Sequence, residues 1–289
     1  MSRKFIYVTE SKFFCRCVKD VLKNKFNMSS GLISALKKTD DGIMVNGNRE
    51  FVNFVLKKGD VLEINIKEGA SENIIPENIE LDILYEDSDF LAVNKPADMP
   101  THTSMGHHFG TLSNGVLYYL LKDGEEHTFH AVTRLDKNTT GVVLVAKNRY
   151  AHDLMSNQLR LGKLNKTYIA VVCGRLEGKG VIDKKIKREQ DSIIKRIVCD
   201  DGDEALTEYE VIKSGDKYSK VLVYPKTGRT HQIRVHMASI GHPLAGDRLY
   251  GGDDFKNRHL LHCYSLEFFH PIKKQNIKIL AKLPPDFTE

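Results

Sequence analysis

Hydrophobic residues near the N-terminus recur at helical spacing. Within residues 11–26 an apolar side chain appears every three or four positions and basic residues fill the opposite face, which predicts an amphipathic helix. The apolar positions of this helix are Phe14, Val18, Val21, Leu22 and Phe26. Ser29-Ser30 can cap a second short helix that ends at Lys37-Lys38, where positive charge suits the negative end of the helix dipole.

A strand pattern follows these two helices. Apolar runs at 43–45 and 61–66 predict short strands, and the pair Asn46-Gly47 predicts a tight turn after the first of them. Residues 1–67 are therefore predicted to form two helices followed by a small hairpin-like sheet. The polar segment 68–78 contains Gly and Pro and has little periodicity, so it marks a boundary.

Strand patterns dominate after this boundary. Residues 81–85 and 90–93 flank a polar turn and predict a hairpin, while the unbroken apolar run 141–146 predicts a strand buried on both faces. Further strands are predicted at 166–172, 205–212, 219–224, 260–269 and 276–281.

Two helices are predicted between these strands. Asn148 can cap a helix that turns inward three apolar side chains, Leu154, Met155 and Leu159, and stops near Gly162. Thr230 can cap a helix that Gly241 ends, and its apolar positions are Ile233, Met237 and Ile240.

These elements together predict an α+β protein with two domains. Residues 1–68 form a small helix-helix-strand domain and residues 69–79 a linker. Residues 80–289 form a large domain on a mixed, mostly antiparallel sheet with flanking helices, a size that one hydrophobic core can fill.

The basic residues are unevenly placed along the chain. The net charge is +5, and residues 1–70 hold 13 Lys and Arg against 8 Asp and Glu, whereas residues 71–289 hold 30 of each. The whole excess therefore lies in the first quarter of the chain, which indicates an anionic partner or simply a contribution to solubility.

The composition also excludes several classes of protein. No apolar run approaches the roughly 18 residues that span a bilayer, and the first residues do not read as a cleaved signal, so a cytoplasmic protein without a membrane partner is expected. The five cysteines are odd in number and mostly far apart, which predicts neither a disulfide framework nor a zinc knuckle.

Three polar segments, at 94–102, 133–141 and 226–236, interrupt the apolar pattern where strands or helices end. Asp136, in the second, precedes the buried strand at a Gly-containing turn and is a candidate nucleophile or base; the alternative is a structural ion pair with Arg134. Arg229, in the third, precedes a helix, and such a cation close to Asp136 would favour its ionised form.

Other polar and aromatic residues each allow two interpretations, one structural and one functional. Tyr168 lies in a predicted strand, where it either packs in the core or offers a flat surface for a nucleobase. Arg234 and His236 either extend a basic surface or give ordinary helix polarity. The histidines have no metal-ligand spacing, and no phosphate-binding glycine motif is present, so neither a metal nor a cofactor is expected.

Taken in order, the three segments resemble the RluA family of RNA pseudouridine synthases, and the resemblance spans most of residues 80–270. The family's His-Arg-Leu-Asp-x-x-Thr-Ser-Gly motif corresponds to residues 133–141, with Thr133 in place of the His and Thr140 in place of the Ser. The resemblance implies a pseudouridine synthase fold and an isomerase without cofactor. It makes Asp136 the nucleophile, Tyr168 the tyrosine that packs on the base and Arg229 the basic partner of the aspartate.

The same resemblance assigns contacts with the RNA substrate. Arg134 corresponds to the arginine that assists base flipping, and the other residues assigned to the substrate are Lys95, Thr140, His231 and Arg234. Large-subunit ribosomal RNA is the expected substrate, with tRNA as the alternative, and the protein is expected to be a monomer.

The N-terminal unit resembles the S-four-like RNA-binding domain that precedes this catalytic domain in many relatives, which would explain the basic excess. Two other functions remain open from the sequence. One is a non-catalytic RNA-binding protein that retains the fold, and the other is a metal-dependent hydrolase that uses the histidine clusters.

Overall fold

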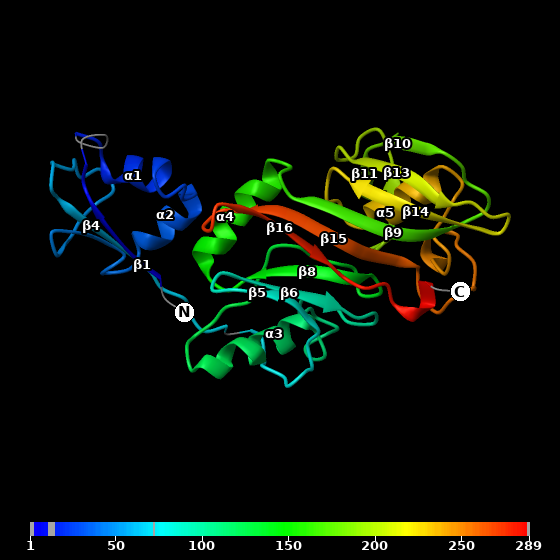
Figure 1. The fold of residues 1–289 in the computed structure, drawn as a ribbon, viewed down its shortest axis with the longest axis horizontal. Helices are drawn as coiled ribbons and strands as arrows, with labels where there is room; N and C mark the ends of the chain where they lie inside the picture. The colour runs from blue at the N-terminus through cyan, green and yellow to red at the C-terminus, as the bar shows by residue number, and fades with distance from the viewer. Residues whose placement is uncertain (1–2, 11–14, 72, 288–289) are drawn as a thin grey trace.

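The computed structural model describes residues 3–10, 15–71 and 73–287. Figure 1 shows a small N-terminal unit beside a larger body built on a long twisted sheet. No helix in the described ranges combines the length and the apolar character needed to cross a bilayer.

The N-terminal unit packs two short helices on a sheet. Among the described residues this sheet has four strands in the order β1-β4-β2-β3, namely β1 (Arg3–Val8), β4 (Val61–Ile66), β2 (Ile43–Val45) and β3 (Asn48–Arg49). Strand β1, which runs antiparallel to β4, was not predicted. Its residues alternate between buried or half-buried and exposed positions, and the basic residues among them hide the strand pattern.

The first helix of this unit is shorter than predicted, and the second has its predicted position. Helix α1 spans Val18–Asn24, not 11–26, and the predicted apolar position Phe14 lies outside the described residues. Helix α2 spans Ser30–Leu36, and the predicted cap is confirmed because the Ser29 side chain accepts a hydrogen bond from the Leu32 amide at 3.1 Å.

The larger body is built on one mixed sheet, which has ten strands in the part of the chain that the structure describes. Strands β8 and β15 are parallel neighbours, and the other neighbouring strands run antiparallel, which confirms the predicted mixed, mostly antiparallel sheet. Its strands are β5 (Ile83–Glu86), β6 (Phe90–Lys95), β7 (His130–Ala131), β8 (Thr140–Ala146), β9 (Asn165–Cys173), β10 (Lys179–Asp183), β13 (Leu206–Lys213), β14 (Tyr218–Pro225), β15 (Leu261–His270) and β16 (Gln275–Leu280).

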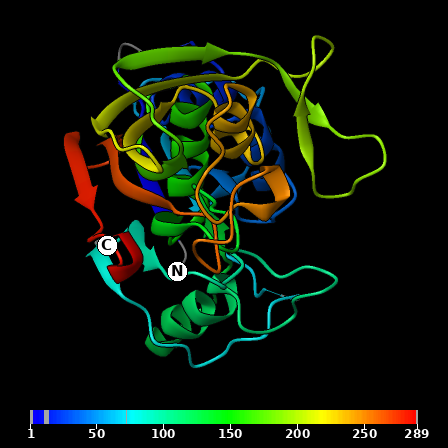
Figure 2. The ribbon, with the colours of Figure 1, turned by 90° about the vertical axis from the view of Figure 1, so that its right-hand side faces the viewer.

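The predicted strands of this sheet are confirmed, and the buried run 141–146 forms β8, whose residues are all buried. Strand β10 and the small hairpin of β11 (Ile186–Arg188) and β12 (Arg196–Val198) were missed. Closely spaced charges such as Lys184-Lys185 and Lys187-Arg188 conceal their alternation. Figure 2 shows this hairpin, in yellow-green, reaching away from the rest of the sheet.

Three α-helices flank the sheet within the described ranges, namely α3 (Leu112–Leu120), α4 (Arg149–Arg160) and α5 (Gln232–Ser239). Asn148 caps α4 as predicted, by accepting a hydrogen bond from the Ala151 amide at 2.8 Å. The inward position predicted for Leu159 is wrong, because this side chain is 40% exposed at the end of the helix. The Thr230 cap is also wrong: α5 starts after His231, which holds a left-handed backbone with φ 57°.

The N-terminal unit is attached to the larger body through α4. Tyr150 and Leu154 of this helix are buried in the same apolar cluster as the helices and strands of the N-terminal unit. The Ser29 amide donates to Asp153 Oδ2 at 2.8 Å, the Tyr150 hydroxyl donates to the Phe26 carbonyl at 2.9 Å, and Arg3 pairs with Asp89. These contacts fix one orientation of the two units.

Candidate active site

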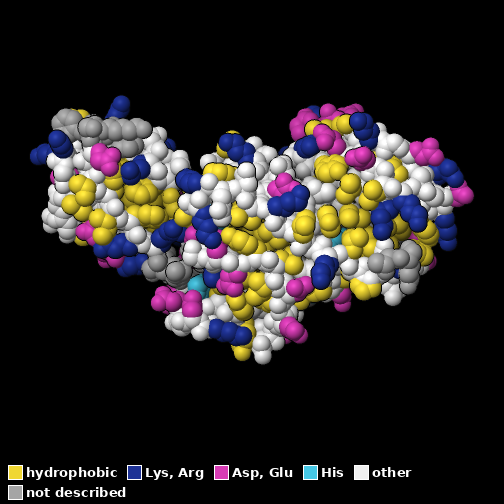
Figure 3. Space-filling model, viewed as in Figure 1, with side chains coloured by type: hydrophobic (Ala, Val, Ile, Leu, Met, Phe, Trp, Pro, Cys, Tyr) yellow, Lys and Arg dark blue, Asp and Glu magenta, His cyan; other side chains and the backbone are white. Residues whose placement is uncertain are grey.

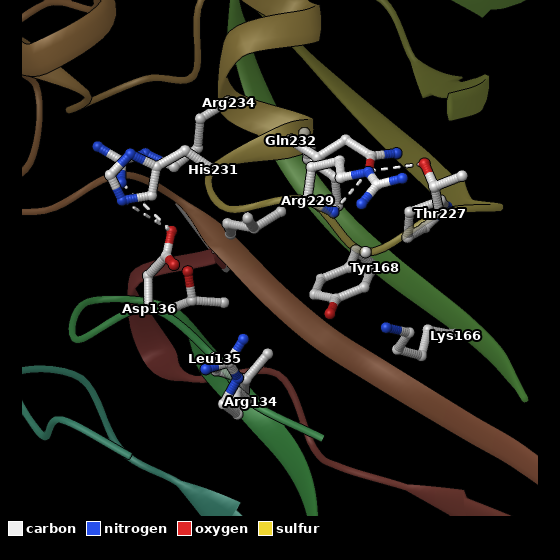
Figure 4. Close-up of a pocket in the computed structure, with 15 residues that line it drawn as sticks. Arg134, Leu135, Asp136, Lys166, Tyr168, Thr227, Arg229, His231, Gln232 and Arg234 are labelled. Atoms are coloured by element: carbon white, nitrogen blue, oxygen red, sulfur yellow. Dashed lines mark hydrogen bonds and ion pairs between the residues drawn. The ribbon is translucent and has the colours of Figure 1, made fainter. Parts of the chain in front are cut away.

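A cleft opens where β9, the segment between β14 and α5, and the loop before β8 meet. The larger of its two parts has a volume of about 590 Å³, and Asp136, Lys166 and Arg229 line both parts. Figure 4 shows Asp136 and Tyr168 facing this space from different elements. The structure therefore brings together the second and third polar segments of the sequence.

Asp136 lies against two nitrogen-bearing side chains of the α5 segment. Its Oδ2 atom is 3.3 Å from Arg234 Nη1 and 3.6 Å from His231 Nε2, and its side chain is 29% exposed. The His231 ring is held from its other side, because Nδ1 is 2.8 Å from the Tyr250 hydroxyl. Burial, together with the charge of Arg234, lowers the pKa of His231 against the opposing effect of Asp136, which favours a neutral imidazole.

Arg234 is fixed by a second carboxylate. Its Nε and Nη2 donate to Asp247 at 2.7 and 2.8 Å, a bidentate pair in which both side chains are buried. The guanidinium also lies 4.9 Å from the centre of the Tyr250 ring. Asp247 thus holds the group that contacts Asp136, although it lies outside the three polar segments identified in the sequence.

Arg229 does not contact Asp136 in this structure, so the predicted pairing of these two residues is wrong. Its Nε donates to the Glu204 carbonyl at 3.0 Å, and Nη1 lies 3.7 Å from Asp203. The prediction failed because α5 begins one residue later than expected, after His231 rather than after Thr230. Arg234 therefore lies in the first turn of the helix and faces Asp136, whereas Arg229 lines the cleft from the preceding segment.

Tyr168 lies on β9 with its side chain at the cleft and only 7% of its surface exposed. It belongs to the main hydrophobic cluster of the sheet, which confirms the core position, and the ring also lines the cleft. Burial raises the pKa of its hydroxyl well above the ordinary value, so the phenol stays protonated near neutral pH.

Two residues predicted to contact RNA are instead buried beneath the loop. Lys95 is fully buried and its Nζ donates to the carbonyls of Pro96, Met99 and Lys137 at 2.8, 2.8 and 2.9 Å. Thr140 is 5% exposed, and its hydroxyl lies 2.8 Å from His262 Nδ1. Because neither side chain reaches the cleft, an RNA contact by these residues is wrong for this structure.

Buried polar side chains hold the loop that carries Asp136. Thr101 Oγ1 donates to the Leu135 carbonyl at 2.8 Å, and Arg258 Nη1 donates to the Asn138 carbonyl at 3.0 Å. His259 Nε2 lies 2.8 Å from Thr139 Oγ1, and burial lowers the pKa of His259 to about 2, so this imidazole is neutral. Together with Lys95 these contacts fix the loop, and they come from segments far away in the sequence.

The other residues of the polar segments have different surroundings. Arg134 is exposed at the cleft. Thr133, which stands where the family has His, accepts a hydrogen bond from the Leu144 amide at 2.9 Å through its hydroxyl. His236 is buried between Thr207 Oγ1 and the Lys184 carbonyl, both at 2.8 Å, so its role is structural.

A cluster of side chains of the kinds that can bind a metal ion lies away from the cleft, at the junction of β6, β15 and the N-terminal unit. It consists of Asp87, Asp89 and His270. Asp87 accepts hydrogen bonds from Tyr85, His270 and Lys273, and Asp89 accepts one from Asn148. Burial opposes the charge of Asp87, but the bonds from Lys273 and Tyr85 lower its pKa. These contacts satisfy the carboxylates without an ion.

Comparison with known proteins gives this cleft a context. The pattern of the RNA pseudouridylate synthase family matches residues 89–239. An RNA pseudouridine synthase of Bacillus subtilis is 40% identical over 268 residues, which cover 92% of this chain and 95% of that protein. The ribosomal large subunit pseudouridine synthase D of Blochmanniella floridana is 38% identical, over 76% of this chain and 74% of that protein.

A solved structure agrees with these sequence relatives. Human RNA pseudouridylate synthase domain containing 1 is 28% identical, with a TM-score of 0.60, and the alignment covers 72% of this chain and 85% of that chain. The fold implied by the sequence resemblance is therefore confirmed.

Proposed function

Because this chain belongs to the RluA family of RNA pseudouridine synthases, isomerases that act on uridine in RNA, we propose that Asp136 is its catalytic carboxylate. The observation that carries this proposal is the position of Asp136 at the cleft, 3.3 Å from Arg234 and on a loop that buried side chains hold in place. A reacting carboxylate needs a fixed position and a nearby positive charge, and both are present here.

The proposed roles follow from the positions of the neighbouring side chains. Tyr168 packs on the target base. Arg234, rather than Arg229, is the basic partner of Asp136. Arg134 and Arg229, both exposed at the cleft, contact the RNA strand around the target. His231 helps to position Asp136. The uridine leaves its stack to enter the cleft, which is easiest in a loop or bulge.

The proposed substrate is large-subunit ribosomal RNA, with tRNA as the alternative outcome of the experiments below. The name of the Blochmanniella floridana relative supports ribosomal RNA. We also propose that residues 1–68 form an RNA-binding domain, residues 69–79 a linker and residues 80–289 the catalytic domain. The protein is proposed to be cytoplasmic and monomeric.

The N-terminal unit is proposed to be an S-four-like RNA anchor. Its two helices and short sheet support this assignment, and so does its share of the basic residues. On the face shown in Figure 3, Lys and Arg side chains of this unit lie along its edges. Phosphate contacts from such residues give affinity without reading sequence.

The Asp136→Asn variant tests the catalytic assignment. We expect it to bind structured RNA with nearly unchanged affinity and to form no pseudouridine, because the amide keeps the shape of the side chain but lacks its negative charge. Conversion is measured by quantifying pseudouridine in the RNA after incubation. Near wild-type conversion by this variant would refute the assignment of Asp136.

The RNA target is identified by mapping pseudouridine in total RNA from cells with and without this protein. Modified sites that vanish on deletion and return with the wild-type gene, but not with Asp136→Asn, name the RNA and the position. If binding occurs with steep salt dependence but no site vanishes, the protein is a non-catalytic RNA-binding member of the family.

A further inference from the structure

Lys166 lines the cleft beside Tyr168. Both residues belong to β9 and are two positions apart, so their side chains leave the strand on the same face. Lys166 lines both parts of the cleft. Figure 4 shows its amine directed toward Tyr168, with Asp136 beyond the ring in this view.

The amine of Lys166 makes no hydrogen bond or ion pair with any other described residue, although the side chain is half-buried. Two other cations near Asp136 do have partners: Lys95 donates to backbone carbonyls, and Arg234 is paired with Asp247. An ideal Cβ on Gly228 would lie 3.9 Å from the Lys166 amine. Because glycine has no side chain, Gly228 presents only its backbone to this amine.

An unpaired amine in a half-buried position is unfavourable, because its desolvation is not offset by a partner. Burial accordingly lowers the pKa of Lys166. Such a group gains a partner when a ligand with oxygen acceptors enters the cleft. The ring of a uridine has two carbonyl oxygens, O2 and O4, and a base that packs on Tyr168 brings its edge to this amine.

The chemistry of the reaction makes a cation at this position useful by every route. If the C1′–N1 bond breaks by attack at the sugar or by elimination, its electron pair stays on the uracil ring and its charge spreads to O2 and O4. If a carboxylate oxygen adds to C6 instead, the electron pair of the C5–C6 double bond moves to C5 and O4. Each route therefore places negative charge on the ring.

We propose that Lys166 is a further catalytic residue, which donates a hydrogen bond from its amine to a ring carbonyl oxygen and stabilises the negative charge that develops there. This inference rests on the proposed function. A donor whose partner becomes strongly negative only in the transition state speeds the chemical step more than it strengthens binding. The exposed Arg134 is better placed for phosphates.

The test compares Lys166→Met with Lys166→Arg in the full chain. The RNA is a transcript that contains the uridine mapped by the deletion experiment. Lys179→Met serves as the matched control, since Lys179 is exposed on β10 and lies outside the cleft lining. Single-turnover conversion, RNA affinity as a function of salt, and thermal unfolding are measured for each protein.

We expect Lys166→Met to lower the single-turnover rate constant about 100-fold, in the range for removal of one charge-stabilising donor. RNA affinity, its salt dependence and the unfolding temperature stay within error of wild type. Lys166→Arg recovers at least tenfold in rate, and Lys179→Met behaves like wild type.

Other outcomes overturn the proposal. A rate constant within threefold of wild type removes the catalytic role. Weaker binding with a salt slope reduced by about one and an unchanged rate makes Lys166 a phosphate contact. A lower unfolding temperature without rescue by Arg makes its role structural. Asp136→Asn is assayed in parallel: if it is active, the proposed function fails, whereas inactive Asp136→Asn with normal Lys166→Met refutes only this inference.

Discussion

The ion pair between Arg234 and Asp247 is the part of the site whose loss has the most predictable effect. Asp247→Ala leaves the Nε and Nη2 donors of Arg234 without acceptors, in a place where the two side chains are only 8% and 1% exposed. Each unsatisfied buried donor costs about 1–3 kcal/mol, and removal of one partner of a buried pair costs about 3–5 kcal/mol in measured cases.

We therefore expect Asp247→Ala to lower the free energy of unfolding by about 3–5 kcal/mol. Turnover should also fall at least tenfold, because the released guanidinium is free to shift toward Asp136, its remaining carboxylate partner. The measurements are urea unfolding followed by circular dichroism, and pseudouridine formation at a temperature where the variant is folded.

A double variant separates stability from catalysis. In Asp247→Leu with Arg234→Met, both charges are replaced by apolar groups, which removes the unpaired donors and should restore much of the stability. It should nevertheless be inactive, because Asp136 has lost its cation. A loss below about 1 kcal/mol for Asp247→Ala, or an active double variant, would refute this account of the site.

Two further predictions concern the support of the loop and of the sheet. Burial lowers the pKa of Lys95 to about 7, against about 10.4 in an unfolded chain, so the unfolded state binds more protons between these values and wild type gains up to about 4 kcal/mol of stability from pH 7 to 10. Lys95→Met should lack this gain, and equal pH dependence of urea unfolding in both proteins would contradict it. At Gly141, with φ 108°, an ideal Cβ would lie 2.2 Å from the Cys263 carbonyl oxygen, so Gly141→Ala should cost about 3 kcal/mol or more. The control Gly47→Ala, with φ 79° and open space, should cost only about 1–2 kcal/mol in the same urea assay, and equal losses would show that the contact with Cys263 is unimportant.

The sequence predicted those elements whose pattern is local. The continuous apolar run of β8 and the Asn148 cap of α4 were recognised because neighbouring residues alone determine them. Leu159 was misplaced because it ends the helical stripe at a point where the cleft, not the core, adjoins the helix. Periodicity gives the face of a helix but not where the core stops.

The site shows the same division between local and distant information. Asp136 and Tyr168 were identified from motifs and lie together at the cleft, whereas the cation beside Asp136 depends on where α5 begins. Helix α5 begins after His231, whose backbone is left-handed, and no pattern of side chains predicted this conformation. Arg258 contacts the Asn138 carbonyl, and Asp247 pairs with Arg234. Both contacts join residues from different segments of the chain, so they arise only when the chain is folded.

Helix α4 has a consequence for the kind of RNA that the protein accepts. Its first turns are packed into the N-terminal unit through Tyr150 and Leu154, and Leu159 near its other end lines the larger part of the cleft. Twelve helical residues extend about 18 Å, and this length is rigid. If the N-terminal unit anchors RNA as proposed, α4 sets the distance between the anchored RNA segment and the cleft. The protein then selects substrates by the spacing between that segment and the target uridine, independently of the sequence between them.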